Sequence, residues 1–191
     1  LAHVRFGYAT EKFYEIPLGI CFAEYRYDPA IKKYLKKKYN LRDNFIVVGM
    51  IARYHPNKNF SNFFLMASLL SELDEHIVFC LAGSGVSEEN AELQALISKF
   101  NLSDKIILIG EIESSQQLLS FFDVFVSTSK GESFSLILLE ALATGLPCVA
   151  YVKADPLSLI GARGTIVDQL DAEKFAGAVI KQINTDMSPR C

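Results

Sequence analysis

S-T-S-K-G-E-S-F-S-L-I-L-L-E-A-L-A-T-G-L-P-C-V-A, residues 127–150, is the stretch from which the fold can be read. An apolar run, Asp123 to Ser127, ends at the first residue of this stretch, and a turn of small polar residues follows. From Leu136 the pattern is helical and almost wholly apolar, until Gly145 and Pro147 supply the signals that end a helix. Because a second apolar run follows, the stretch predicts a strand, a turn, a helix and another strand.

Glu140 is the exception in this apolar helix. A carboxylate among leucines and alanines is costly to bury unless a donor or a cation pairs with it. Glu132 lies in the preceding turn, and the free amides of Phe134, Ser135 and Leu136 open the helix between the two carboxylates. A helix N-terminus favours phosphate. The pattern therefore indicates a nucleotide, with its phosphate on the amides and its sugar diol on a carboxylate.

A second interpretation of these residues needs no ligand. In it, Ser135 caps the helix and Glu140 pairs with a lysine. The stretch alone does not decide between the nucleotide site and this structural arrangement.

Strands and helices alternate along the rest of the chain. Apolar runs predict strands at 45–51, 77–82, 105–109, 123–127, 148–151 and 165–167. Helical patterns begin at Asp28 and Leu136 and cover 59–73, 87–100, 114–121 and 171–183. We therefore expect one α/β domain over 1–191, a Rossmann-like doubly wound parallel sheet with helices on both faces. Residues 1–44 form its leading segment and basic helix, and 45–185 its core.

In such a sheet, ligands bind beyond the carboxyl ends of the strands. Arg53 and Lys58 follow the first strand and form a candidate clamp for a diphosphate, the alternative being ordinary surface charge. The candidate residues that follow predicted strands are Arg53, Lys58, Gly83, Ile112, Glu132 and Phe134. They share one edge of the sheet, where the sequence predicts one ligand site.

Composition excludes some classes of partner. The net charge of −3 argues against nucleic acid, which is bound by broad basic surfaces. The four cysteines form no C-x-x-C pair. Two of them, Cys80 and Cys148, lie in apolar runs, which favours reduced thiols in a cytoplasmic protein.

Lysines crowd the helix that begins after Asp28: Lys32, Lys33, Lys36, Lys37 and Lys38. A solvated helix face accounts for them, and this is the interpretation that we favour. The alternative is peripheral contact with an anionic membrane at its inner face.

The central stretch resembles the retaining glycosyltransferases of family 4, which have the GT-B fold. The resemblance rests on a Glu-x7-Glu motif followed by E-A-x-A-x-G-x-P-x-V-A, here Glu132, Glu140, Ala141, Ala143, Gly145, Pro147, Val149 and Ala150. It covers residues 45–183. Members of the family have E-G-F-G or E-S-F-G at the positions of Glu132 to Ser135. They have a P-N-G-I-D hinge at the positions of Pro17 to Cys21.

The resemblance implies a role for each candidate residue. Arg53 and Lys58 would neutralise the departing diphosphate, Glu132 would hold the donor sugar at the reacting face, and Glu140 the ribose. It also assigns to the donor site Gly83, Ile112, Ser133, Phe134, Ser135 and Leu136, with Ile112 against the base. No metal or other cofactor is implied, and the sequence shows no cluster of metal ligands.

We therefore expect the nucleotide-sugar-binding half of a retaining hexosyltransferase. Its acceptor, a glycan or a lipid-linked sugar, would bind an N-terminal domain that this sequence does not include, so the chain alone is expected to bind donor without transferring sugar. A GT-B sugar-nucleotide epimerase is one alternative, although it should lack the full carboxylate and cation set. A non-catalytic ligand-binding or interaction module is another, and a flavodoxin-like regulator would need an acidic phosphorylation pocket that the sequence lacks.

Overall fold

The computed structural model describes residues 6, 7, 9, 14, 19–132, 134–151, 164–168 and 170–185. Pro17 and Leu18 of the expected hinge lie outside the described residues. So does Ser133 of the expected donor site.

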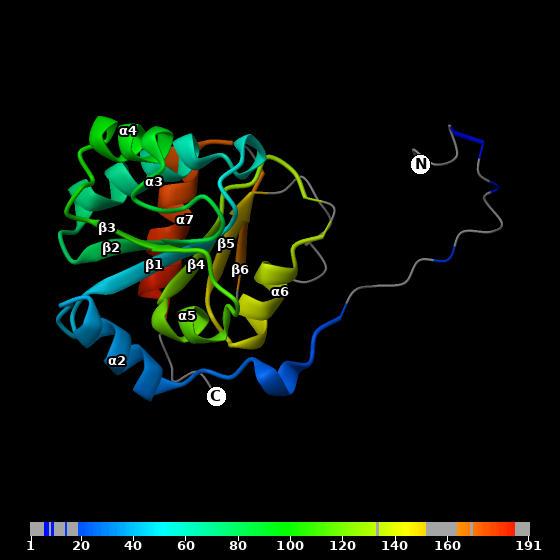
Figure 1. Cartoon of the computed structure of the whole chain (residues 1–191), viewed down its shortest axis with the longest axis horizontal. Helices are drawn as coiled ribbons and strands as arrows, with labels where there is room; N and C mark the ends of the chain where they lie inside the picture. The colour runs from blue at the N-terminus through cyan, green and yellow to red at the C-terminus, as the bar shows by residue number, and fades with distance from the viewer. Residues whose placement is uncertain are drawn as a thin grey trace.

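The described residues contain one sheet of parallel strands, in the order β3-β2-β1-β4-β5-β6 (Figure 1). The strands are β1 (Ile46–Ile51), β2 (Ile77–Ala82), β3 (Ile106–Gly110), β4 (Val124–Ser127), β5 (Cys148–Tyr151) and β6 (Gly164–Val167). Each lies within a residue or two of its expected range. The doubly wound parallel sheet is confirmed.

Helices pack on both faces of this sheet (Figure 1). One face carries α3 (Phe60–Leu73), α4 (Ala91–Lys99) and α7 (Ala172–Asn184). The other carries α2 (Pro29–Lys38), α5 (Gln116–Phe121) and α6 (Leu136–Ala143). Two short 3-10 helices, η2 (Phe22–Glu24) and η3 (Pro56–Lys58), lie in the leading segment and after β1.

The apolar runs are continuous because both faces of the strands are covered, and β2 shows this along its whole length. All its residues are buried. Ile77, Phe79 and Leu81 join the core cluster under α3, α4 and α7, whereas Val78, Cys80 and Ala82 join the cluster under α2, α5 and α6. Burial raises the pKa of the Cys80 thiol, so this cysteine is a neutral packing residue.

The helix expected from Ser87 begins later, at Ala91. Asn90 caps it, since its side-chain oxygen accepts from the Leu93 amide at 3.1 Å. The amide group of the same side chain donates to the Gly85 carbonyl at 2.6 Å. Asparagine is a strong N-cap, and here it also holds the preceding loop in place.

The prediction that the lysines of α2 form a solvated face was wrong for two of them. Lys32 pairs with Asp123, which is buried and directly precedes β4. Lys36 is itself buried and donates to the carbonyls of Asp43 at 2.7 Å and Phe45 at 2.8 Å. These contacts satisfy both ammonium groups and attach α2 to the sheet, while the other lysines of the set are exposed.

The strand order reverses between β1 and β4. From β1 the chain moves outward through β2 to β3, then returns to the other side of β1 as β4. The β1–β4 ladder has two pairs, Val48↔Val124 and Gly49↔Phe125, whereas β1 and β2 pair along six residues. Open α/β sheets bind ligands at such a reversal, which places the loops 52–59 and 128–135 at the expected site.

Gly49 provides a test of the packing around β1. A Cβ atom at this position would lie 2.1 Å from the ring of Phe122, which is fully buried. We expect Gly49→Ala to lower the free energy of unfolding by about 1–3 kcal/mol, because the ring has no room to move.

Gly177→Ala is the matched control. A Cβ there meets nothing within 4 Å, and the residue lies inside α7. Alanine should therefore raise stability by about 0.5–1 kcal/mol. Urea unfolding measures both variants, and a Gly49→Ala midpoint equal to that of the parent would contradict the packing described.

Candidate functional site

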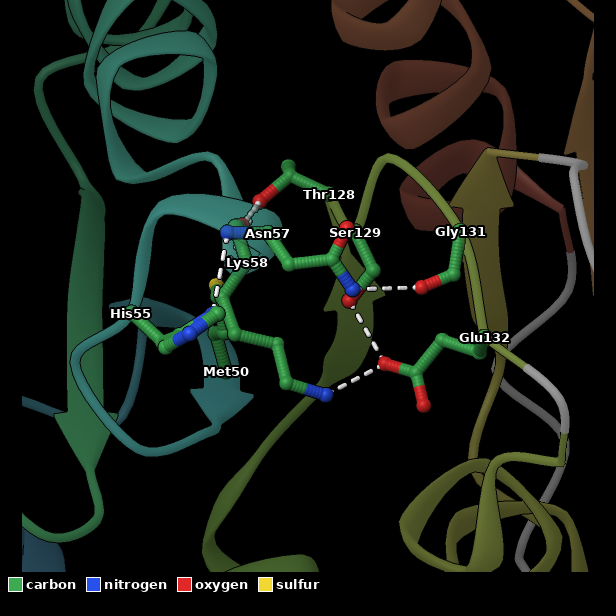
Figure 2. A network of polar contacts seen from close by, with 8 residues as sticks. All are labelled: Met50, His55, Asn57, Lys58, Thr128, Ser129, Gly131 and Glu132. Atoms are coloured by element: carbon green, nitrogen blue, oxygen red, sulfur yellow. Dashed lines mark hydrogen bonds and ion pairs between the residues drawn. The ribbon is translucent and has the colours of Figure 1, made fainter.

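Hydrogen bonds hold the loop after β1 against the loop after β4 (Figure 2). The Asn57 side chain donates to the Gly131 carbonyl at 2.6 Å, and the Lys130 amide donates to the Asn57 carbonyl at 2.8 Å. The hydroxyl of buried Thr128 donates to the Lys58 carbonyl at 2.8 Å. The two loops therefore form one unit at the point where the strand order reverses.

The loop after β1 takes its shape from local signals. The ring nitrogen Nδ1 of His55 accepts from the Asn57 amide at 3.2 Å, and Pro56 occupies the first position of η3. Asn59 has φ 55°, a left-handed conformation that asparagine tolerates, and it leads the chain from η3 into α3. His55 thus orders the loop that carries Lys58.

Lys58 and Glu132 form an ion pair across the two loops, 2.5 Å from Nζ to Oε1. The hydroxyl of Ser129 donates to the same oxygen at 2.6 Å. The side chains of Lys58 and Glu132 are only 20% and 18% exposed. The contact is therefore better shielded from solvent than a surface ion pair.

The two cations of the expected clamp differ in their surroundings. Lys58 is paired and half-buried, so ordinary surface charge does not describe it. Arg53 is exposed and makes no hydrogen bond or ion pair with the residues that the structure describes. Both follow β1, but Arg53 alone leaves its charge open to an incoming anion.

Gly83 has a structural reason to be glycine. Its φ is +136°, and a Cβ atom would lie 2.3 Å from the carbonyl oxygen of Ala52. The loops after β1 and β2 touch here, since the Tyr54 amide donates to the Ser84 carbonyl at 2.8 Å. The backbone that comes close to Gly83 is thus the chain's own, next to Arg53.

The N-terminus of α6 contains a hydroxyl without a partner. Ser135 occupies the N-cap position, but its side chain makes no capping hydrogen bond. Its Oγ is buried and finds no hydrogen-bond partner in the described part of the chain. The interpretation in which Ser135 caps the helix is therefore wrong. Phe134 is half-buried before it, and Leu136, the first residue of α6, is exposed.

Among the described residues, Glu140 is paired with a hydroxyl and not with a lysine. Ser115, at the N-cap position of α5, donates to Glu140 Oε2 at 2.5 Å. Tyr25 of the leading segment lies against the same carboxylate: burial, then the charge of Glu140 and a hydrogen bond to it, raise the pKa of the tyrosine hydroxyl. The helix expected from Ser114 begins at Gln116, whose amide donates to the Ser114 hydroxyl at 3.4 Å.

The expected residues thus fall into two groups along one edge. Lys58 and Glu132 are in direct contact, with Arg53 and Gly83 in adjoining loops. The second group lies at α5 and α6 and contains Glu140, which is bonded to Ser115. Ile112, in the loop before α5, belongs to it too and packs, half-buried, against the core under these helices. The supporting hydroxyls were missed: Ser115, Tyr25, Thr128 and Ser129. Serine and threonine in loops give no distinguishing pattern.

A separate cavity of about 210 Å³ lies beside η3, between the loops and α3 and α4. Its lining residues are Tyr54, His55, Pro56, Asn59, Phe60, Ser61, Glu92, Leu96 and Lys130. Burial, then the charge of Glu92 and a hydrogen bond to it, raise the pKa of Tyr54. None of the residues predicted for the site lines this cavity.

Across the ranges described, no group of three or more histidine, cysteine, aspartate or glutamate side chains is arranged to hold a metal ion. Within the same ranges, no helix combines the length and the apolar character needed to cross a bilayer.

The contrast between the two cations predicts different effects on stability. Lys58→Ala leaves the half-buried Glu132 without its cation, so we expect a loss of about 1–3 kcal/mol. Arg53→Ala removes an exposed, unpaired side chain and should change stability by less than about 0.5 kcal/mol. Thermal unfolding of both variants checks this, and equal melting temperatures would show that the ion pair does not contribute to stability.

Comparisons with known proteins agree with this architecture. The family model described as "Glycosyl transferases group 1" matches residues 31–190. A putative glycosyltransferase of Bacillus subtilis, EpsF, is 34% identical over 108 residues, 54% of this chain and 27% of its own length. An Escherichia coli relative, UDP-Gal:alpha-D-GlcNAc-diphosphoundecaprenol alpha-1,3-galactosyltransferase, is 30% identical over 172 residues, 87% of this chain and 44% of its own. The chain thus spans less than half the length of these relatives.

Solved structures share the fold. Anabaena HepE in complex with UDP and glucose superposes with a TM-score of 0.83 at 23% identity, covering 96% of this chain and 50% of its own. WaaG, a glycosyltransferase involved in lipopolysaccharide biosynthesis, gives a TM-score of 0.80 at 17% identity, covering 93% and 49%. The fold is that of one half of a GT-B glycosyltransferase. Because the family model matches this chain along most of the chain's length, this chain belongs to the group 1 glycosyl transferases.

Proposed function

We propose that this chain binds the nucleotide-sugar donor of a retaining glycosyltransferase, at the edge where the strand order reverses. The diphosphate would meet the N-terminus of α6, with the ribose on Glu140 and the sugar beside Glu132. The transfer, of a hexose to a glycan or lipid-linked acceptor, belongs in this proposal to the longer protein of which the chain would be the donor half.

The observation that carries the proposal is the buried hydroxyl of Ser135, which has no hydrogen-bond partner among the described residues. Leaving a buried hydroxyl without a partner is costly, so each such group needs an explanation, and a bound ligand is one. Ser135 stands at the N-terminus of α6, where the helix dipole and free amides favour an anion. A phosphate oxygen would accept from the hydroxyl and from the amide of Leu136.

The cations after β1 support the same ligand. A diphosphate leaving group gains negative charge in the transition state, and fixed positive charges at that position lower the barrier. Arg53 is exposed and free to turn to the ligand. Lys58 holds Glu132 and would reach the diphosphate from the same loop. No step in this proposal is assigned to a metal ion.

The environment of Glu140 supports a ribose site. Its carboxylate already accepts from a hydroxyl, that of Ser115, and the hydroxyls of a ribose would be donors of the same kind. Ile112, in the loop before α5, offers an apolar surface for the base. The names of the E. coli relative and of the HepE complex contain UDP, which makes a uridine nucleotide the first to test.

Ser135→Ala tests the phosphate site in the 191-residue chain. Alanine removes a hydroxyl that has no protein partner in the described residues, so the free energy of unfolding should not fall. The affinity for UDP should drop about tenfold, the effect of one lost hydrogen bond to a charged group. Isothermal titration calorimetry measures this, and unfolding in urea measures stability.

Ser71→Ala is the matched control, because the Ser71 hydroxyl on α3 is also buried and has no partner in the described ranges. It should leave the UDP affinity unchanged. If the parent chain binds neither UDP, GDP nor ADP at millimolar concentration, the proposed function is wrong. If both serine variants bind UDP like the parent, Ser135 does not contact the phosphate.

A further inference from the structure

The two oxygens of Glu132 have different surroundings. Oε1 accepts from Lys58 Nζ at 2.5 Å and from Ser129 Oγ at 2.6 Å. Oε2 accepts no hydrogen bond from the residues that the structure describes. Figure 2 shows this second oxygen turned away from both donors. One side of the carboxylate is thus held by the protein, and the other is left to accept from a ligand.

Ser129 is the better fixed of the two donors. It is 5% exposed and follows β4 after one residue, Thr128. The hydroxyl of Thr128 bonds the Lys58 carbonyl, and Ser127 pairs with Ala150 of β5. The sheet and the joined loops therefore set the position of the Ser129 hydroxyl.

Lys58 is less suited to hold Glu132 throughout a reaction. Its ammonium group sits on a flexible four-carbon stem and acts as a point charge that can change partners. A bound diphosphate carries more negative charge than a carboxylate and competes for this cation. A donor that cannot leave is then needed to keep Glu132 in place.

We propose that Ser129 is a positioning residue for the donor sugar. Its hydroxyl holds Oε1 of Glu132, so that Oε2 accepts from a sugar hydroxyl even when Lys58 turns to the diphosphate. This inference rests on the proposed function, because it requires a nucleotide sugar at the loops. It assigns to Ser129 an effect on the sugar part of the ligand and none on the nucleotide part.

The test compares ligands with and without the sugar. Calorimetry on the 191-residue chain measures the affinity for UDP and for whichever of UDP-glucose, UDP-galactose and UDP-N-acetylglucosamine binds most tightly. Ser129→Ala should weaken the nucleotide sugar about fivefold and leave UDP unchanged. Ser129→Cys fills a similar volume with a poor donor and should behave like the alanine variant, whereas Ser129→Thr keeps the hydroxyl and should restore affinity.

A double-mutant cycle with Glu132→Gln separates positioning from a structural role. If Ser129 acts through Glu132, Ser129→Ala should cause no further loss of nucleotide-sugar affinity in the Glu132→Gln background. Additive losses would overturn the inference, as would an equal loss for UDP and the nucleotide sugar. A parent chain that binds no nucleotide overturns the proposed function itself. If the parent binds UDP but the affinity losses of Ser129→Ala and Glu132→Gln add up in the double variant, only the role of Ser129 is overturned.

Discussion

The hydrogen bonds that join the loop after β1 to the loop after β4 are the contacts on which the site depends. In a parallel sheet these loops leave from the same edge, and the reversal of strand order makes them neighbours. Asn57 then bonds both Lys130 and Gly131, and Thr128 bonds Lys58. Residues 70 or more positions apart in the chain are thereby held at hydrogen-bond distance.

Within this joined unit, charges are arranged in two ways. Lys58 and Glu132 neutralise each other and are shielded, whereas Arg53 remains exposed. Partial burial strengthens the ion pair and also makes the loss of either partner costly. An anion that enters beside the N-terminus of α6 would therefore meet the exposed Arg53, and Lys58, which it must share with Glu132. This sharing makes Ser129, a neutral and buried donor, relevant to the position of the carboxylate.

The sheet could be predicted from the sequence because each buried strand is a continuous apolar run, as β2 illustrates. Contacts between side chains were harder. The isolation of Glu140 in an apolar helix showed that it needs a donor, but Ser115 lies 25 residues away and carries no signal of its own. Lys32 and Lys36 looked solvated because their partners come close only when α2 packs on the sheet. These partners are a carboxylate directly before a distant strand and two carbonyls.

We expect the ligand to lie at this edge and not in the cavity beside η3. A titration of the ¹⁵N-labelled chain with UDP, followed by amide NMR, tests it most directly. We expect the largest changes in amide chemical shift at Arg53, at Phe134 to Leu136 and around Ile112. These residues belong to separate loops that would meet only around a nucleotide. Shifts confined to Ser61, Glu92 and Leu96, which line the cavity, or no shifts at millimolar UDP, would contradict a nucleotide site at this edge.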